Sequence, residues 1–574
     1  MLPETHADLA EWGAATVRES FVAYQEEFKR ITRRARHRFE ECDWRAAQRD
    51  ALERLDLRPR CITSAVDELR GVLGDAASSP ELRRCMKMAY ARHLADRPDP
   101  ELARTFFNSV TRRIFGTVGV DPSVEFVAVE AAPRPAAGGA PMVAIYPRQA
   151  TTEALVAAIL RDFSFSVPYC DRADDARLAA AEIDAQLRAE GTPPFDAVEM
   201  LRSVFFRGKG AYLVGRVRRG ATVSPIIVSL LHEERGIHVD AVLLSGKDAS
   251  IVFSFTRSYF HVEVDRTADL IDFLRSILPQ KPTSEMYISI GYHKHGKTIL
   301  YRELMEHLQR TTDAFRPARG DRGMVMIVFT LSSLDVVFKV IRDRFAPPKS
   351  VTRQEVMQKY ALVFRQDRAG RLVDAQEFEH VVVDRARVSP ELLDELLREA
   401  AESVRVVGDS VEIRHLYAER RVIPLNLFIR EKDECTARDA LLDYGQSIRD
   451  LAATNTFPGD FLLKNFGVTR WGRVIFYDYD ELCLVTDCNF RDLPAPRDDE
   501  EETAGEPWFY VGEDDVFPEE FLPFLGLPER LRDAFVEAHG EILTAEFWRR
   551  MQTRHRAGEI VDIFPYKQTQ RLRH

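Results

Sequence analysis

The chain has 574 residues, of which 30% are charged and 45% hydrophobic, and its formal net charge at pH 7 is −11. This length predicts two to four domains rather than one core, and the acidic balance gives no reason to expect a nucleic-acid partner. No apolar run is long enough to cross a bilayer, and the acidic N-terminus lacks a signal-peptide core. We therefore expect a cytoplasmic protein without a membrane partner. Its seven cysteines form no Cys-x-x-Cys pair, which favours free thiols over a zinc ribbon or a disulfide framework.

Residues 1 to about 115 have the polar and apolar spacing of helices. A loop or domain seam is expected at 133–141, where the sequence reads PRPAAGGAP. Short β-rich pieces separated by Gly and charged turns predict a meander over 210–246, and the run SIVFSFTRSYFHVEV at 250–264 is expected to continue it. A helix is expected at 267–278, and we place the main domain boundary near residue 310.

The segment SIGYHKHGKT contains Gly291-x-x-x-x-Gly296-Lys297-Thr298, a complete P-loop pattern. It is predicted to lie between a strand at 286–290 and a helix at 299–313, which is the context that a P-loop requires. However, no hydrophobic strand ending in a metal-binding Asp follows, and the loop carries two His and a Lys instead of small residues. The favoured interpretation is a basic turn at the domain junction, and a P-loop NTPase using 291–298 stays as an alternative.

The pattern changes after residue 310. We expect strands at 323–331, 335–341 and 474–482, helices at about 352–366, 389–404 and 436–454, a strand-rich segment at 410–429 and an acidic loop at 497–506.

The first two of these strands carry nucleotide-binding features. Gly320-x-x-Gly323-x-Val325 matches the end of the kinase pattern G-x-G-x-x-G-x-V, although Ala318 stands at the first glycine position. The run ending in Lys339 resembles the kinase V-A-I-K strand, whose Lys contacts phosphates. Burying an unpaired ammonium is costly, so Lys339 needs an anionic partner. A strand-edge lysine that reaches solvent is the alternative.

A third piece, GDFLLKNFG, is the most specific. Asp460 precedes Asn465 by five residues, as in the kinase catalytic loop H-R-D-x-x-x-x-N, and Asp478 follows 13 residues later. One carboxylate can face the incoming hydroxyl, while an amide and a second carboxylate hold divalent metal against the phosphates.

The departures from the kinase pattern are also clear. FPGD replaces H-R-D, DYD replaces D-F-G and supplies the extra carboxylate of Asp480, and there is no clear A-P-E. An ordinary eukaryotic-type kinase is therefore excluded, and a divergent kinase-like catalytic domain is favoured. A non-catalytic kinase-like binding module stays as an alternative, although a pure binder has no need for both carboxylates.

Several long segments resemble bacterial isocitrate dehydrogenase kinase/phosphatase: ARGDRGMVMIVFTL, VFKVIRDRFAPPK, IRHLYAERRVIPLN, NTFPGDFLLKNFGVTRWGRVIFYDYDE, NFRDLPAPR and EPWFYVGEDDVFPEEF. The similarity covers essentially the whole chain. It implies an α+β fold, with an N-terminal mixed helical and β regulatory domain at 1–310 followed by a bilobal protein-kinase-like domain at 311–574. The small lobe is expected at about 311–417 and the large lobe at about 422–574.

The resemblance also implies an activity. Such enzymes phosphorylate a serine in the active site of NADP-dependent isocitrate dehydrogenase, which inactivates it, and they also remove that phosphate. This switches carbon between the citric acid cycle and the glyoxylate bypass. Both activities use one ATP/ADP site with Mg²⁺ or Mn²⁺, and AMP is an allosteric effector bound between the domains. Isocitrate dehydrogenase is the expected protein partner, and a homodimer is left open.

Site residues follow by motif match. The expected ATP contacts are Ala318, Arg319, Gly320, Asp321, Arg322, Gly323, Met324 and Lys339. The resemblance makes Asn465 and Asp478 the metal ligands and Asp460 the base or orienting group for the substrate serine. The backbone of 418–421 is expected to form the hinge that receives adenine.

Three assignments are less specific. The resemblance places the family's active-site aspartate at Asp374, for which we hypothesise a role in positioning water for the phosphatase reaction; a surface turn is the alternative. Glu355 is taken as the partner of Lys339, with a solvated helix face as the alternative. The basic C-terminal segment 549–574 is interpreted either as a docking element for an acidic partner or as a solvated tail.

Overall fold

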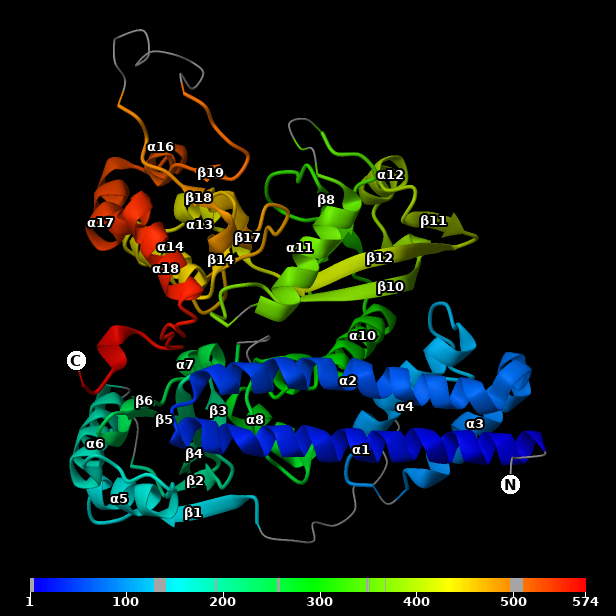
Figure 1. Cartoon of the computed structure of the whole chain (residues 1–574), viewed down its shortest axis with the longest axis horizontal. Helices are drawn as coiled ribbons and strands as arrows, with labels where there is room; N and C mark the ends of the chain where they lie inside the picture. The colour runs from blue at the N-terminus through cyan, green and yellow to red at the C-terminus, as the bar shows by residue number, and fades with distance from the viewer. Residues whose placement is uncertain are drawn as a thin grey trace. The chain divides into compact units, whose positions relative to one another are not determined.

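The computed structural model describes residues 5–573 except 96, 128–140, 190, 192–193, 255–258, 347–348, 350, 367 and 496–508. The chain folds into two compact units, residues 1–310 with 564–574 and residues 311–563. Figure 1 labels their helices and strands. The acidic loop expected at 497–506, and the loop expected at 133–141 apart from its last residue, lie outside the described residues.

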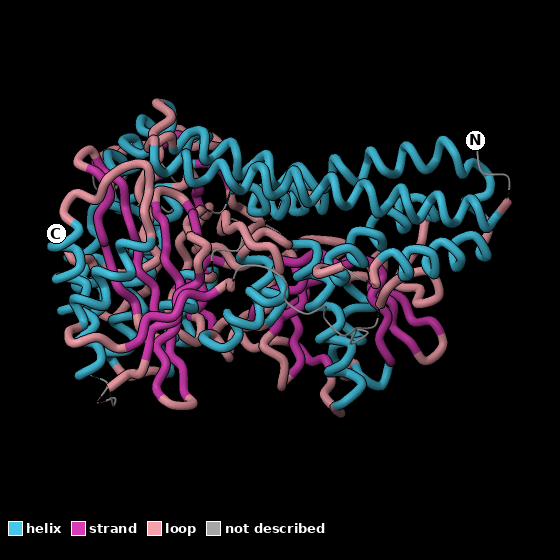
Figure 2. The backbone as a smooth tube through the Cα atoms, turned by 90° about the horizontal axis from the view of Figure 1, so that it is seen from below, coloured by secondary structure: helices cyan, strands magenta, loops and turns pink. Residues whose placement is uncertain are grey.

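Unit 1 begins with four helices: α1 (His6–Glu40), α2 (Trp44–Leu73), α3 (Pro80–His93) and α4 (Pro100–Phe115). The side chains of Thr5 and Asp43 cap α1 and α2 by accepting a hydrogen bond from the backbone N–H three residues further on. The two long helices run side by side (Figure 2), and their facing sides bury apolar residues such as Phe21, Ile31 and Leu69. The helices predicted for residues 1 to about 115 are therefore confirmed.

The middle of unit 1 is an antiparallel sheet in the order β1-β2-β4-β5-β6, with β3 beside β4. Its strands are β1 (Val143–Pro147), β2 (Ala197–Leu201), β3 (Phe205–Arg207), β4 (Gly210–Arg219), β5 (Thr222–Glu233) and β6 (Gly236–Leu243). Helices α5 (Thr152–Asp162) and α6 (Arg172–Ala189) share a core with one face of the sheet, which includes Leu213. The other face, which includes Val214, joins the core of the N-terminal helices. The predicted meander is confirmed by β4, β5 and β6. Its predicted continuation at 250–264 is wrong, because residues 250–252 end a helix, α7 (Gly246–Val252).

The rest of this segment is helical: α7 (Gly246–Val252), α8 (Thr267–Ile277), α9 (Thr283–Ser289) and α10 (His293–Arg310). The strand predicted at 286–290 is wrong, because these residues end α9 and pack into the helical core. The P-loop interpretation is wrong as well, since the sequence HKHGKT is the start of α10 and follows a helix. The favoured basic turn is also wrong, because these basic residues are helical. A Cβ on Gly296 would lie 2.4 Å from Ile288 Cγ1 and 2.6 Å from Ser284 O. This glycine therefore permits close packing of α10 on α9.

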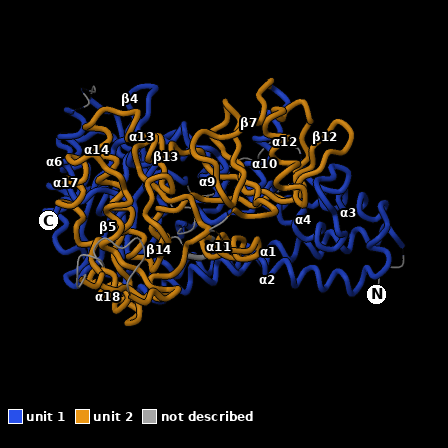
Figure 3. The backbone as a smooth tube through the Cα atoms, turned by 90° about the horizontal axis from the view of Figure 1, so that it is seen from above, with its two compact units in different colours: residues 1–310, 564–574 blue, residues 311–563 orange. Residues whose placement is uncertain are grey.

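The last residues of the chain belong to unit 1 and not to the second domain, to which the sequence analysis assigned them (Figure 3). Tyr566 Oη donates to Asp240 Oδ2 at 2.6 Å, and Arg571 Nε donates to Asp240 Oδ1 at 2.8 Å. Arg573 pairs with Asp175 at 2.5 Å. Both aspartates are fully buried on unit 1. The basic tail thus neutralises acids of its own chain, which contradicts the solvated-tail interpretation for this part of it.

The first half of unit 2, the small lobe, is an antiparallel sheet in the order β10-β12-β9-β8-β7, with β11 beside β12. The elements are β7 (Phe315–Pro317), β8 (Met326–Leu331), β9 (Val336–Ile341), α11 (Arg353–Gln366), β10 (Ala375–Asp384), α12 (Pro390–Glu399), β11 (Val404–Val407) and β12 (Ser410–Arg420). Apolar residues of α11, among them Val356 and Tyr360, pack against Ile341 and Tyr417 of the sheet. The expected strands at 323–331 and 335–341 and the helix at 352–366 are confirmed. The helix predicted at 389–404 ends earlier, at Glu399, and β11 begins at Val404.

The large lobe is built around α14 (Glu434–Ala453), which Asp433 caps and whose buried face forms one core with Phe466, Phe535 and Trp548. Its other helices are α13 (Leu425–Glu431), α16 (Phe521–Phe524), α17 (Glu529–His539) and α18 (Ala545–Arg556). Short strands complete it: β13 (Ile423–Pro424), β14 (Thr456–Phe457), β15 (Phe466–Val468), β16 (Val474–Phe476), β17 (Cys483–Leu484), β18 (Asn489–Phe490) and β19 (Asp515–Val516). The strand predicted at 474–482 stops at Phe476, so that Asp478 lies on irregular backbone. Within the described residues, no helix is long and apolar enough to cross a membrane.

Candidate functional site

A cavity of about 460 Å³ lies between the small-lobe sheet and the large lobe of unit 2. Its wall includes the whole 318–324 segment, Lys339, Asp460, Asn465 and Asp478. These residues come from four separate parts of the sequence. The fold therefore brings all the expected nucleotide and metal residues to one site.

The 318–324 segment connects β7 to β8 and forms the small-lobe wall of the cavity. Gly320 has φ of 120°, in the region that disfavours side chains, and a Cβ on Gly323 would lie 2.8 Å from Met326 O. Arg342 Nε donates to Gly323 O at 3.0 Å and fixes the end of the loop. The side chains of Arg319 and Arg322 are exposed and pair with Glu431 and Glu391.

Lys339 lies on β9, and its side chain is only 6% exposed. Its Nζ lies 2.8 Å from Glu419 Oε2 on β12 and donates to the backbone oxygen of Tyr477 at 2.7 Å. The expected pairing with Glu355 is wrong. Glu355 is exposed and accepts a hydrogen bond from Thr352 N at 2.6 Å at the start of α11. In kinases the equivalent helix supplies the acid, whereas α11 places Tyr360 near the lysine, with its Oη 3.5 Å from Nζ.

Asp460 and Asn465 contact each other directly. Asn465 Nδ2 donates to Asp460 Oδ1 at 2.5 Å, and the N–H of Leu462 donates to the same oxygen at 3.0 Å. Burial raises the pKa of Asp460, and these two hydrogen bonds lower it. Gly459 has φ of 87°, and a Cβ there would lie 2.5 Å from Glu481 Cβ. The glycine of FPGD is thus required by the close approach of the next acid-bearing segment.

Asp478 lies two residues beyond β16, half-buried on the cavity wall. Burial, and then the neighbouring Asp480 carboxylate, raise the pKa of Asp478 to about 7 against the opposing charge of Lys339. Asp480 pairs with Lys349 at 2.8 Å. Burial alone would lower the pKa of Lys349, but its pairs with Asp480 and Glu481 raise it.

These side chains fit a divalent cation that is coordinated partly by the protein and partly by phosphate oxygens. Hard cations such as Mg²⁺ prefer oxygen donors and are usually held by one or two carboxylates together with phosphate oxygens. Asp478 and Asn465 provide a carboxylate and an amide oxygen on one wall. In the part of the chain that the structure describes, no group of three or more His, Cys, Asp and Glu forms a ready-made metal site. A bound ligand would therefore have to complete the coordination.

The expected hinge is partly displaced. Ala418 is buried in the sheet, where it pairs with Phe338 and Gln376, whereas Glu419 and Arg420 line the cavity together with Val422. Of the expected 418–421 hinge, Glu419 and Arg420 are therefore the residues that reach the cavity wall.

Asp374 lies just before β10 and is half-buried, but it is not part of the cavity wall. The side-chain amide of Gln376 donates to its carboxylate. Burial raises the pKa of Glu419, Lys339 opposes this rise, and the charge of Asp374 adds to it. Asp374 is thus within electrostatic reach of Glu419, the partner of Lys339.

Sequence reasoning missed Glu419, Lys349 and Tyr360. The signal for Glu419 was available, because a glutamate inside the apolar strand HLYAER needs a cationic partner as much as Lys339 needs an anion. No comparable signal marks Lys349 or Tyr360.

Two family models match the chain. The isocitrate dehydrogenase kinase/phosphatase (AceK) regulatory domain matches residues 14–312, and the kinase domain of the same family matches 313–568. A protein of Anaeromyxobacter sp. (strain Fw109-5) named isocitrate dehydrogenase kinase/phosphatase is 59% identical over 568 residues, which is 99% of each chain. One of the same name from Xanthomonas euvesicatoria pv. vesicatoria is 44% identical over 564 residues, which is 97% of each chain. The chain therefore belongs to the isocitrate dehydrogenase kinase/phosphatase family, with a regulatory domain followed by a kinase domain.

Proposed function

We propose that this protein phosphorylates a serine of NADP-dependent isocitrate dehydrogenase with ATP and removes the phosphate again, using one cavity for both reactions. The observation that carries the proposal is the meeting of Lys339, Asp460, Asn465 and Asp478 beneath the glycine-containing 318–324 loop. A non-catalytic binder would need the lysine and the loop, but not two acids in these positions.

The roles of the residues follow from their positions. The 318–324 backbone and Lys339 bind the phosphates of the nucleotide. Asn465 and Asp478 would hold Mg²⁺ or Mn²⁺, which supplies neutralising charge to the phosphates when bound. Asp460, oriented by Asn465 and Leu462 N, faces the substrate hydroxyl and accepts its proton. Burial raises the pKa of Asp460, which makes it a better proton acceptor than an exposed aspartate.

For the reverse reaction we assign to Asp374 the positioning of the attacking water. Asp374 does not line the cavity, and the support is electrostatic: its half-buried carboxylate acts on Glu419, which does line the cavity, and Gln376 donates a hydrogen bond to that carboxylate of Asp374. AMP as an allosteric effector and control of flux between the citric acid cycle and the glyoxylate bypass complete the proposal, and both come from the family resemblance.

The test is a labelling experiment with the full-length protein, γ-labelled ATP, Mg²⁺ and isocitrate dehydrogenase, beside the Asp478→Ala variant. Label is followed into the dehydrogenase, and its release is followed after ATP is exchanged for ADP and AMP. We expect incorporation and release by the wild type, and neither by the variant. Absence of incorporation by the wild type would refute isocitrate dehydrogenase as the substrate and would favour the alternative of a non-catalytic binding module.

A further inference from the structure

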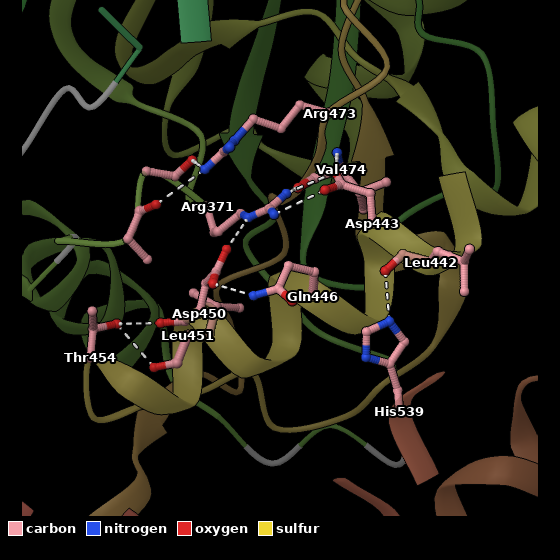
Figure 4. Close-up of polar contacts among 12 residues, drawn as sticks. Arg371, Leu442, Asp443, Gln446, Asp450, Leu451, Thr454, Arg473, Val474 and His539 are labelled. Carbon is pink, nitrogen blue, oxygen red and sulfur yellow. Dashed lines mark hydrogen bonds and ion pairs between the residues drawn. The ribbon is translucent and has the colours of Figure 1, made fainter. Parts of the chain in front are cut away.

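Arg371 lies in the connection between α11 and β10, and its side chain is 3% exposed. Its guanidinium holds two acids of α14: Nη1 and Nη2 donate to the two oxygens of Asp443 at 2.8 and 3.0 Å, and Nε donates to Asp450 at 2.7 Å (Figure 4). Nη1 also donates to the backbone oxygen of Val474 on β16 at 2.8 Å. One side chain therefore ties together three separate segments of unit 2.

The backbone around Arg371 makes the same connection. Phe476 N donates to Arg371 O at 2.7 Å, and Val373 N donates to Phe476 O at 3.0 Å. The hydroxyl of Tyr479 donates to Val373 O. Residues 371–373 thus form a short parallel pairing beside β16, and the guanidinium fastens both segments to α14.

The position of this cluster in the sequence is informative. Asp374 follows Arg371 by three residues, and Asp478 follows the end of β16 by two. β16 is also held by β15 through three residue pairs, so that Asp478 keeps support when Arg371 is lost. The 371–373 segment is held to β16 by its backbone bonds with Phe476, and the Arg371 guanidinium links it to α14. Arg473 donates to the carbonyls of residues 369 and 370 over longer distances of 3.3 and 3.4 Å.

We propose that Arg371 is a positioning residue that fixes Asp374 relative to Asp478 and so sets the ratio of phosphatase to kinase activity. This inference rests on the proposed function, and in particular on the role of Asp374 in dephosphorylation. Because the fork geometry of arginine bonds both oxygens of Asp443 while still reaching Asp450, lysine cannot replace all of these bonds.

Loss of Arg371 also destabilises the fold, since Asp443 and Asp450 on α14 would lose the arginine with which they form ion pairs. Burial raises the pKa of Asp443, and the Arg371 charge and hydrogen bonds outweigh this and lower it. Two variants separate position from folding: Arg371→Lys, which keeps the charge, and the triple variant Arg371→Met/Asp443→Asn/Asp450→Asn, which removes all three charges together. Arg449→Lys is the matched control, because Arg449 is on the same helix and bonds Ala538 O and Glu541 on the side facing α17 and the residues that follow it.

The experiment measures kcat and KM of both reactions with the full-length protein and isocitrate dehydrogenase, with thermal unfolding recorded for each variant. We expect Arg371→Lys and the triple variant to lower the phosphatase kcat by about 10- to 100-fold, the scale of a misplaced catalytic group, and the kinase kcat by less than about threefold. Arg449→Lys should change neither rate. A parallel loss of both rates in both Arg371 variants would overturn the inference.

Measuring the Arg371→Lys effect in the Asp374→Ala variant separates a positioning role of Arg371 from a purely structural one. If Arg371 acts through Asp374, Arg371→Lys should not lower the residual phosphatase rate of Asp374→Ala any further, because the two effects are not additive. Additive losses would overturn the inference while leaving the proposed function intact. Equal loss of both activities in Asp374→Ala alone would overturn the role of Asp374 and with it this inference. Absence of both activities in the wild type would instead refute the proposed function.

Discussion

Lys339 and Glu419 form a nearly fully buried ion pair, with Nζ 2.8 Å from Oε2 and side-chain exposures of 6% and 1%. They lie on the neighbouring strands β9 and β12, where Lys339 faces Tyr417 and Glu419 faces Val337. The pair is thus a diagonal contact across the sheet, and it holds the ammonium against the cavity wall. The ammonium of Lys339 is thus positioned by an acid of the small-lobe sheet and not by a glutamate of α11.

Glu419→Gln should lower kinase kcat/KM by about tenfold or more, equivalent to about 1.4 kcal/mol, because Lys339 loses its charged partner while the shape of the site is kept. Removing one partner of a buried pair typically costs about 3–5 kcal/mol, so the melting temperature of the variant should also fall. Initial rates and thermal unfolding with and without ATP check both effects. Glu355→Gln is the matched control and should preserve activity, since Glu355 is exposed. Equal loss in the control would show that the α11 acid matters after all.

The contrast between these two glutamates shows what the sequence could predict. Asp460, Asn465 and Asp478 are close together in the sequence and are joined by short loops. Their meeting at one site could therefore be predicted from their spacing. The partner of Lys339 could not be predicted in this way. Glu419 lies on β12, and β12 is the neighbour of β9 because of the sheet order β10-β12-β9-β8-β7, which residue patterns along the sequence do not reveal. The Arg371 cluster likewise joins segments about 70 to 100 residues apart.

Two other errors have different causes. The apolar run at 286–290 is too short for periodicity to separate a strand from a buried helix, and its burial in the helical core decides for α9. The tail could not be placed from its basic composition, since the acids that it meets, such as Asp240, lie on a strand more than 300 residues earlier.

Gly296 and Lys297 test the rejected P-loop directly. Lys297→Ala should leave ATP turnover within about twofold of the wild type, whereas loss of a P-loop lysine would abolish it. Gly296→Ala should lower the melting temperature, because the added Cβ would meet Ser284 O at 2.6 Å. Steady-state ATPase or kinase rates and thermal unfolding give the two readouts. Loss of nucleotide turnover in Lys297→Ala, with binding to the 318–324 loop intact, would restore the P-loop interpretation.

Glu303 on α10 should make the stability of the protein depend on pH. Burial raises the pKa of Glu303 from 4.5 to about 7, and the charge of Glu285 adds to this rise. The folded state then holds a proton that the unfolded state has released, so stability is greatest at low pH and falls as pH rises from about 4.5 to about 7. Above pH 7 this contribution is constant.

Glu303→Gln should remove that fall, and the variant should be more stable than the wild type above pH 7 by an amount on the order of 3 kcal/mol. Thermal unfolding at intervals between pH 5 and pH 8 measures the slope. Glu306→Gln changes an exposed acid of the same helix, paired with Arg310, and should keep most of the wild-type slope, because the charge of Glu306 raises the pKa of Glu303 less than burial and Glu285 do. A Glu303→Gln profile that runs parallel to the wild type would contradict the prediction.

The C-terminal tail should contribute to the stability of unit 1 through one hydroxyl. Tyr566 Oη lies 2.6 Å from Asp240 and 2.9 Å from Ser229, both with essentially no solvent exposure. Tyr566→Phe keeps the ring and removes both hydrogen bonds, and a buried group left without its partner costs about 1–3 kcal/mol. We expect the melting temperature to fall by roughly 2–6 °C, whereas Lys567→Ala, at an exposed neighbouring position, should leave it unchanged.

Both kinase and phosphatase kcat should stay near the wild-type values in both variants, because the tail bonds lie in unit 1 and not at the cavity of unit 2. Equal melting temperatures for Tyr566→Phe and the wild type would show that the tail is held by other contacts.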